Sequence, residues 1–283
     1  MNTYDTLRRF YAQLVTATAG VTESRIVDAF ASVKREQFVG AGPWHIQVAG
    51  GYMVTETDNP AVLYQDINIG LAPKRGVNNG EPSLHAKCMA AAAVNQGDVV
   101  IHVGAGSGYY TAMLAHLVGL SGRVHAYEIE TDMAHWATEN LTEYGVVTVY
   151  ARSALGLPLP SADVIYVSAG ATHVPGEWLD ALAPGGRLVL PLTPNERLGC
   201  MLLVTRRYDT AYAARVFSPA AFIPCVGARD DEQSRALAAA LDARSADDIR
   251  SLHRGTEPDE TAWCVGNGWW LSTAEPVGHS HGF

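Results

Sequence analysis

The sequence predicts an α/β fold built on a doubly wound, mostly parallel β-sheet, and two patterns carry this prediction. From residue 82 onwards, short apolar runs typical of buried strands alternate with stretches of helical periodicity. Such alternation favours parallel strands, because the crossover between two parallel strands is usually a helix. In addition, one turn between a strand and a helix, residues 104–110, holds three closely spaced glycines, which indicates that a ligand approaches the backbone there.

The first 80 residues are expected to be helical at the start and loop-rich afterwards. An amphipathic pattern over residues 7–14 favours a soluble helix over the apolar core of a signal peptide. Thr22 and Glu23 predict the start of a second helix, because a hydroxyl caps free amides and an acid favours the first turn. Gly and Pro recur throughout residues 36–80, which predicts loops.

The elements of the sheet follow in a regular order. The patterns predict a helix at 82–94, a strand at 99–103, a helix at 111–118, a strand at 124–127, a helix at 132–144, strands at 146–150 and 164–167, a short helix at 178–182 and a strand at 187–190. The apolar runs 200–205 and 213–217 have no helix between them, so they predict an antiparallel hairpin at the edge of the sheet.

The last part of the chain has its own pattern. A helix is expected over residues 231–244, and Asn267-Gly268 between two apolar runs predicts a β-hairpin. Trp263, Trp269 and Trp270 flank this turn. We expect them to form a local hydrophobic plug rather than to cover a binding site or to join two subunits.

Composition excludes several functional classes. The chain has 283 residues, of which 48% are hydrophobic and 17% charged, so it can bury a substantial core and is not a disordered chain. Its net charge of −9 and its scattered Lys and Arg argue against a nucleic-acid partner. No apolar run approaches the roughly 18 residues that a membrane span needs.

Cysteines and histidines give no sign of a disulfide framework or of a metal site. The four cysteines are far apart and form no C-x-x-C pair, which indicates reduced thiols and a cytoplasmic location; they are Cys88, Cys200, Cys225 and Cys264. His279 and His281 have no partner ligands nearby in the sequence, so we expect a tail there rather than a bound metal.

The glycine-rich turn indicates a particular cofactor. Gly104, Gly106 and Gly108 allow sharp bends and a close approach of the ligand, and the following helix N-terminus offers free amides. In a dinucleotide loop the third glycine comes three positions after the second, where this chain has Tyr109. A bulky residue fits poorly beside a diphosphate but is compatible with S-adenosylmethionine, which has no phosphate. The alternative is a glycine-rich turn that binds nothing.

An acidic residue, Glu128, ends the next apolar run and is expected at the carboxyl end of the second strand. A carboxylate at this place can accept hydrogen bonds from both ribose hydroxyls of the cofactor. A solvated acid at a strand end is the alternative, but the glycine loop upstream favours ribose binding.

Several motifs together resemble the protein-L-isoaspartate O-methyltransferase family over roughly residues 20–225. They are the early helix 21–38, which ends in Arg35-Glu36-Gln37-Phe38; the loop 76–82, which lines up with the family's G-x-T-I-S-x-P; the cofactor loop 104–110 with Glu128; the turn 184–187; and the segment Phe222-Ile223-Pro224. The resemblance implies a class I methyltransferase with a Rossmann-like fold. It further implies transfer of a methyl group from S-adenosylmethionine to a carboxylate of an isomerised aspartate in a peptide or protein.

The resemblance also implies roles for residues and a division of the chain. The residues implied for catalysis are Asn78, Asn79 and Gly80, and those implied for cofactor binding are Gly104, Ala105, Gly106, Gly108, Glu128 and Ile129. Residues 1–80 are expected to form a helical and loop segment that covers the active site, residues 81–227 the S-adenosylmethionine-binding domain, and residues 228–283 a C-terminal extension.

Three positions depart from the family's pattern. Gly80 stands where the family has the serine that helps to hold the acceptor carboxylate, and Glu81 adds a negative charge beside it. Arg152 stands where the family has an acid facing the adenine, and a guanidinium cannot accept a hydrogen bond from an amino group. Two alternatives therefore stay open: a divergent methyltransferase of a natural-product peptide or small molecule, and a non-catalytic cofactor-binding protein.

The acceptor decides whether a base is needed. A carboxylate, with a pKa of about 4, is ionised at neutral pH, whereas an amine or hydroxyl acceptor usually needs a general base. His85 and His173 are the candidates for such a base. For both, a histidine satisfied by packing or hydrogen bonds is the favoured interpretation.

Overall fold

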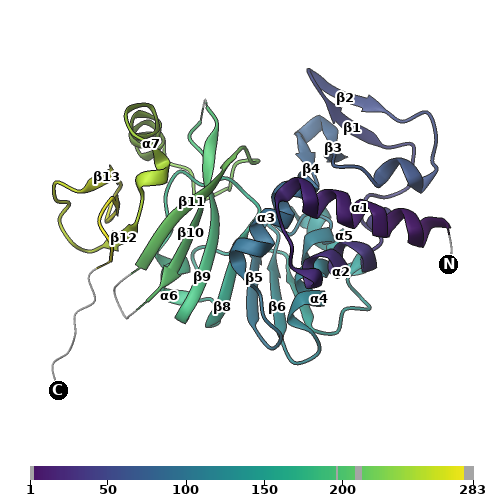
Figure 1. The fold of residues 1–283 in the computed structure, drawn as a ribbon, viewed down its shortest axis with the longest axis horizontal. Coiled ribbons are helices and arrows are strands. Elements are labelled where there is room, and N and C mark those ends of the chain that lie inside the picture. Colours follow the sequence, from purple (N-terminus) through teal and green to yellow (C-terminus); the bar gives the residue numbers. More distant parts are fainter. Residues whose placement is uncertain (1–2, 196, 208–211, 277–283) are drawn as a thin grey trace. The chain divides into compact units, whose positions relative to one another are not determined.

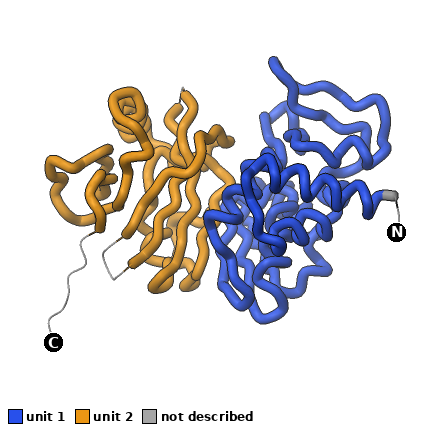
Figure 2. Tube along the Cα trace, viewed as in Figure 1, with its two compact units in different colours: residues 1–152 blue, residues 153–283 orange. Residues whose placement is uncertain are grey.

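The computed structural model describes residues 3–195, 197–207 and 212–276, and it divides into two compact units, residues 1–152 and 153–283 (Figure 2). His279 and His281 lie outside the described residues. Within the described part of the chain, no helix is both long enough and apolar enough to cross a membrane.

The first unit combines a helical N-terminus, a small antiparallel sheet and three parallel strands with their helices (Figure 1). Its elements are α1 (Thr3–Ala19), α2 (Ser24–Ser32), η1 (Arg35–Phe38), β1 (His45–Val48), β2 (Gly51–Val54), η2 (Pro60–Leu63), β3 (Ile69–Ala72), η3 (Pro73–Arg75), β4 (Val77–Asn78), α3 (Pro82–Ala92), β5 (Val99–Val103), α4 (Tyr109–Val118), β6 (Arg123–Tyr127), α5 (Thr131–Asn140) and β7 (Val147–Tyr150).

The parallel strands confirm the predicted α/β pattern. β5 pairs with β6 and β6 with β7, all in parallel, so that Val103, Tyr127 and Tyr150 end neighbouring strands at the same edge. α4 begins at Tyr109, two residues earlier than predicted, because Gly108 leaves the turn with a φ of +96° and the helix follows at once. α5 ends at Asn140 rather than at Tyr144, and the chain then turns into β7.

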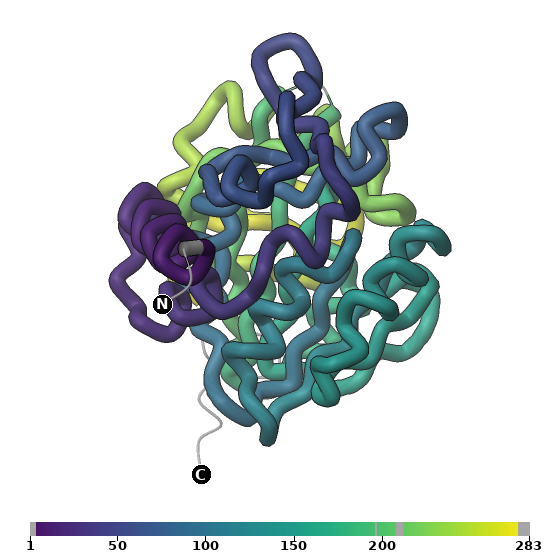
Figure 3. The backbone as a smooth tube through the Cα atoms, turned by 90° about the vertical axis from the view of Figure 1, so that its right-hand side faces the viewer, coloured from purple at the N-terminus to yellow at the C-terminus, as the bar shows by residue number. Residues whose placement is uncertain are grey.

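A four-stranded antiparallel sheet, in the order β2-β1-β3-β4, occupies the region that the sequence predicts as loops. Its strands are only two to four residues long, which is why alternation of apolar and polar residues is not visible in them. The β1–β2 hairpin extends away from the helices of the same unit (Figures 1 and 3). The base of the sheet packs on a small core of Val39, Trp44, Leu63 and Ile69.

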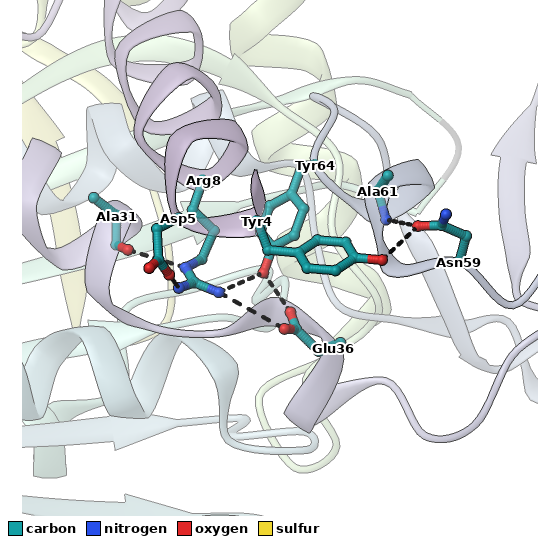
Figure 4. Close-up of polar contacts among 8 residues, drawn as sticks. All are labelled: Tyr4, Asp5, Arg8, Ala31, Glu36, Asn59, Ala61 and Tyr64. Carbon is teal, nitrogen blue, oxygen red and sulfur yellow. Dashed lines mark hydrogen bonds and ion pairs between the residues drawn. The ribbon is translucent and has the colours of Figure 1, made fainter. Parts of the chain in front are cut away.

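A polar network ties α1 to η1 and η2 (Figure 4). The Arg8 guanidinium donates to the Ala31 carbonyl at 3.3 Å and forms an ion pair with Glu36 at 3.8 Å. The Tyr64 hydroxyl donates to Glu36, and the burial of Tyr64 together with this neighbouring carboxylate raises the pKa of the Tyr64 phenol. These contacts join the N-terminal helix to the 3-10 helices of its unit.

The second unit continues with strands and carries the C-terminal segment (Figure 1). Its elements are β8 (Ala162–Val167), α6 (Gly176–Ala181), β9 (Leu182–Leu192), β10 (Gly199–Arg206), β11 (Tyr212–Ala220), α7 (Asp231–Ala243), η4 (Ala246–Asp248), β12 (Ser251–Arg254), β13 (Ala262–Val265) and β14 (Trp269–Ser272). β8 and β9 are parallel, whereas β10 is antiparallel to both β9 and β11.

The predicted antiparallel hairpin is present as β10 and β11, and the C-terminal strands continue the sheet beyond it. β12 pairs with β11, β14 with β12, and β13 with β14, all antiparallel. Gly268, with a φ of +77°, forms the predicted turn between β13 and β14. The strands after residue 227 therefore continue the sheet of the second unit.

The tryptophans of this segment are buried, which confirms the predicted plug: Trp263, Trp269 and Trp270 are at most 5% exposed. The Trp269 indole donates to Gln233 Oε1 at 2.8 Å and so links β14 to α7. The four cysteines are buried thiols, in agreement with the predicted reduced state. Burial raises the pKa of Cys200 to about 12 and that of Cys264 to about 11.

Candidate cofactor and acceptor site

The glycine loop joins the carboxyl end of β5 to the first residue of α4. Gly104, Gly106 and Gly108 have φ values of +78°, +56° and +96°, which side chains rarely adopt. A Cβ atom at Gly108 would also lie 2.8 Å from Leu141 Cδ1. The Gly104 and Ala105 amides donate to the Tyr127 carbonyl at 2.9 and 3.2 Å, so the end of β6 fixes the start of the loop.

Glu128, directly after β6, is joined to this loop by its side chain. Its Oε2 accepts from the Gly106 amide at 2.7 Å, and its Oε1 accepts from the Glu130 amide at 3.0 Å. The residue is 7% exposed, and burial raises the pKa of its carboxyl, while these amide donors act in the opposite direction. Each carboxylate oxygen has a second lone pair, so Glu128 can still accept two hydroxyl hydrogens from a ligand.

Ser107 is the residue of the loop with unsatisfied hydrogen-bonding capacity. Its hydroxyl is buried and has no hydrogen-bond partner among the residues that the structure describes. Its carbonyl accepts from Asn140 Nδ2 at 2.8 Å, which fixes the backbone around it. A buried hydroxyl without a partner is costly, so it points to a polar ligand beside the loop.

Two stacked tyrosine rings lie at the carboxyl ends of β6 and β7. Tyr127 and Tyr150 stack at a centroid distance of 4.8 Å with an angle of 14° between their planes. The Arg152 guanidinium lies over Tyr127, 4.9 Å from the ring centroid. Ile129 is 42% exposed, which leaves an apolar side chain available beside Glu128.

The predicted catalytic residues lie in the loop between β4 and α3. Asn78 Oδ1 accepts from the Gly80 amide at 2.9 Å and so closes a tight turn. Asn79 is buried, and its Oδ1 accepts from the Ile69 amide at 2.9 Å and from Arg35 at 3.5 Å. Its Nδ2 has no hydrogen-bond partner within the described part of the chain. The described contacts of Asn79 therefore hold the loop in place by joining it to Ile69 and Arg35.

Gly80, His85 and Tyr110 form one packed group. The His85 ring stacks on the Tyr110 ring at a centroid distance of 3.5 Å, and the Tyr110 hydroxyl donates to the Gly80 carbonyl at 3.1 Å. A Cβ atom at Gly80 would lie 2.4 Å from His85 Nε2. Burial, assisted by His102 and Arg35, holds the pKa of His85 well below its usual value, so the imidazole is neutral.

Glu81 occupies the N-cap position of α3 without making a capping hydrogen bond. The cap comes from Asp66 instead, whose Oδ1 accepts from the Ser83 amide at 2.8 Å. Glu81 is exposed, and partial desolvation followed by the charge of Asp66 raises the pKa of its carboxyl. The sequence gives no local sign of Asp66, because it acts across 17 positions of the chain.

The second unit holds the remaining residues that the sequence singles out. Its Gly170 amide donates to the Ile223 carbonyl at 2.8 Å, which joins the end of β8 to the predicted segment 222–224. His173 Nδ1 lies 3.4 Å from the Thr172 hydroxyl, and partial burial lowers the pKa of His173. Arg229 donates to the Gly170 and Thr193 carbonyls at 3.0 and 2.6 Å, a clamp that no local motif predicts.

Comparisons with known proteins agree with this arrangement. A family model described as protein-L-isoaspartate(D-aspartate) O-methyltransferase matches residues 12–230. The protein-L-isoaspartate O-methyltransferase 2 of Marinobacter nauticus is 30% identical over 225 residues, which cover 78% of this chain and 93% of that protein.

Two solved structures share the fold. A protein-L-isoaspartate O-methyltransferase superimposes with a TM-score of 0.65 at 24% identity, over 78% of this chain and 66% of that chain. A Plasmodium falciparum protein described as a protein-L-isoaspartate O-methyltransferase, in complex with S-adenosyl-L-homocysteine, has a TM-score of 0.62 at 17% identity, over 77% of this chain and 97% of that chain. These likenesses confirm the predicted Rossmann-like fold of class I methyltransferases, with its antiparallel strands.

Proposed function

The chain belongs to the protein-L-isoaspartate(D-aspartate) O-methyltransferase family, and on this premise we propose that it methylates a carboxylate of isoaspartyl residues in peptides or proteins. As a member of this family, it is an S-adenosylmethionine-dependent methyltransferase. In the proposed reaction a carboxylate oxygen forms a bond to the methyl carbon while the bond from that carbon to sulfur breaks, and S-adenosylhomocysteine leaves. The observation that carries the proposal is the family match over residues 12–230, which includes both the glycine loop and the loop 76–82.

The glycine loop and its neighbours fit the cofactor. The unpartnered Ser107 hydroxyl and the spare lone pairs of Glu128 offer polar contacts, and the three glycines keep the backbone accessible. We expect the following residues to bind it: Gly104, Ala105, Gly106, Gly108, Glu128 and Ile129. When bound, the cofactor supplies a methyl group that is electrophilic because it is attached to a sulfonium. The protein then has to align the acceptor and exclude water.

A carboxylate is the acceptor that these residues favour. It is already ionised at neutral pH, so the reaction needs no general base. The neutral, buried His85 imidazole has a pKa well below the usual histidine value and is a poor base. Glu81, whose charge would repel an anion, is exposed to solvent, where that repulsion is screened.

One observation favours a second class of methyl acceptor. His85 Nε2 occupies the place of a side chain at position 80, so the surroundings of this loop differ from those of a loop with serine there. A methyltransferase of a natural-product peptide or small molecule is therefore the alternative.

Release of S-adenosylhomocysteine tests the proposal. Two peptides of one sequence are compared, the first with an isoaspartyl and the second with an ordinary aspartyl residue. We expect release with the first peptide only.

Glu128→Ala should weaken cofactor affinity about ten- to a hundredfold, since it removes hydrogen bonds to a charged group. Cofactor binding without release from either peptide would refute the acceptor, and absence of cofactor binding would refute the enzyme class.

We also infer a peptide or protein partner, no nucleic-acid partner and a cytoplasmic location. The buried thiols support a reducing compartment. The division into residues 1–80, 81–227 and 228–283 stays a proposal as well. It is supported at its second boundary by the end of the family match at residue 230.

A further inference from the structure

Arg152 is held over two aromatic rings at the strand ends. Its guanidinium carbon lies 4.9 Å from the Tyr127 ring centroid and 5.6 Å from that of Tyr150. The two rings stack on each other, because Tyr127 and Tyr150 are register partners in β6 and β7. Tyr150 is itself fixed, since its hydroxyl lies 3.1 Å from His125 Nδ1. A guanidinium over such a platform has a defined plane.

The backbone of Arg152 is joined to that of Glu128. Both the Glu128 amide, at 3.1 Å, and the Arg152 amide, at 2.9 Å, donate to the Tyr150 carbonyl. In doubly wound sheets, a nucleoside lies across the carboxyl ends of neighbouring strands, with its ribose at the acid that ends the second strand. A nucleoside whose ribose binds Glu128 therefore has its base toward the end of β7, where Arg152 follows.

We propose that Arg152 is a specificity-determining residue for the nucleobase and recognises it through an acceptor atom on the base. This inference rests on the proposed cofactor site. A guanidinium carries five N–H donors and no acceptor. It can donate to a ring nitrogen of adenine, but it cannot accept a hydrogen bond from the exocyclic amino group. An ionised acidic residue at the same place could accept a hydrogen bond from the amino group but could not donate one to a ring nitrogen.

The two preferences can be separated with one chemical change in the ligand. The desamino analogue of S-adenosyl-L-homocysteine has a hydrogen atom in place of the exocyclic amino group and keeps every ring nitrogen of the base. Arg152 therefore keeps its acceptor in the desamino compound, whereas a carboxylate at position 152 loses the N–H donor that it would bind. The ratio of the two dissociation constants, desamino over adenosyl, then reports which kind of group faces the base.

The experiment measures both dissociation constants by calorimetry for the full chain and for Arg152→Asp. We expect the wild-type chain to bind the two ligands within about threefold of each other, and the ratio to rise at least tenfold in Arg152→Asp, the size expected for exchanging a charge-assisted hydrogen bond. Arg123→Asp is the matched control. It makes the same charge change on an exposed residue at the opposite end of β6, and its ratio should stay at the wild-type value.

Arg152→Gln keeps the test decisive if Arg152→Asp does not fold. Its amide can both donate and accept, so its ratio should lie between those of the other two chains. Equal ratios in wild type, Arg152→Gln and any folded Arg152→Asp, with both ligands bound, would overturn the inference while leaving the cofactor site intact. If the wild-type chain binds neither ligand, the proposed cofactor site itself fails.

Discussion

At the scale of single residues, the loop between β4 and α3 depends on the contact between Gly80 and His85. Gly80 has a φ of +74°, and a Cβ atom there would meet His85 Nε2 at 2.4 Å. The imidazole cannot retreat easily, since it stacks on Tyr110 and is buried. The Tyr110 hydroxyl in turn holds the Gly80 carbonyl. Each of the three residues therefore limits what the other two can be.

Gly80→Ala is expected to destabilise the protein by about 1 to 3 kcal/mol, because a β-carbon adds backbone strain and a steric overlap. Gly76→Ala is the matched control: Gly76 has a similar φ of +71°, but nothing lies within 4 Å of its added Cβ. Its cost should be smaller, from strain alone. Urea unfolding measures both. In a His85→Ala background, Gly80→Ala should cost no more than Gly76→Ala does, because the overlap is gone. Equal costs for the two glycine variants in the wild-type background would contradict the steric account.

Glu128 predicts a pH dependence of cofactor affinity. Burial raises the pKa of this carboxyl above its ordinary value of 4.5. Only the ionised form offers every lone pair to amides and ribose hydroxyls. Affinity for S-adenosylhomocysteine should therefore fall as the pH drops through the raised pKa, towards the weaker affinity of a chain with a neutral side chain at position 128. Calorimetry from pH 8 down to pH 4, over which the chain is shown to stay folded, checks this.

The raised pKa of Glu128 affects the stability of the fold in the opposite direction from cofactor affinity. A carboxyl whose pKa is raised in the folded protein contributes most to stability below its unfolded pKa, and this contribution is lost as the pH rises through the folded pKa. Acid unfolding driven by Glu128 thus cannot imitate the loss of affinity. Glu128→Gln should bind more weakly at neutral pH and show a flat profile. A wild-type affinity that is constant over the range would remove Glu128 from the ribose site.

The sequence predicts those candidate site residues whose place depends on local backbone conformation. Gly104, Gly106 and Gly108 adopt positive φ values in the turn that their spacing predicts, and Glu128 lies at the expected strand end. Asn79 was predicted as catalytic, but it is buried against Arg35, which lies 44 positions away. A contact of this kind depends on how distant segments pack, and no short motif encodes it. Its catalytic role stays a prediction.

At the scale of elements, length decides what the sequence could predict. The strands β5 and β6 are five residues long and mostly buried, and the sequence predicts their bounds to within a residue. β4 has two residues and owes its existence to pairing with β3. Pairing across a sheet can make a strand of residues that have no strand pattern of their own. This is why the small sheet in residues 45–78 was not predicted.

The tryptophan plug gives a prediction at this scale. Trp270 is 3% exposed and stacks on His253 at a centroid distance of 4.1 Å. Trp270→Ala should lower the free energy of unfolding by about 3 to 5 kcal/mol, because it leaves a large cavity under β12 and β14. Val265→Ala is the control, since that side chain is 47% exposed and should change stability by less than about 0.5 kcal/mol. Similar urea midpoints for both variants would show that the plug does not stabilise the sheet.

At the scale of the whole molecule, the two units each enclose their own buried thiols. Cys88 belongs to the first unit, and Cys200, Cys225 and Cys264 belong to the second. Burial raises the pKa of Cys200 to about 12 and of Cys264 to about 11, so very little of the reactive thiolate is present at pH 8. In the folded protein these thiols should react with Ellman's reagent far more slowly than free cysteine does. Reaction at the rate of free cysteine would contradict their burial.

Because the two units hold different numbers of cysteines, the number of labelled cysteines reports which unit has unfolded. A chain exposed briefly to a maleimide in moderate urea gains one label if only the first unit has opened, three if only the second has, and four if both have. Intact-mass spectrometry reads these populations directly, without an introduced probe. The order in which the peaks appear with rising urea would then give the sequence of unfolding events.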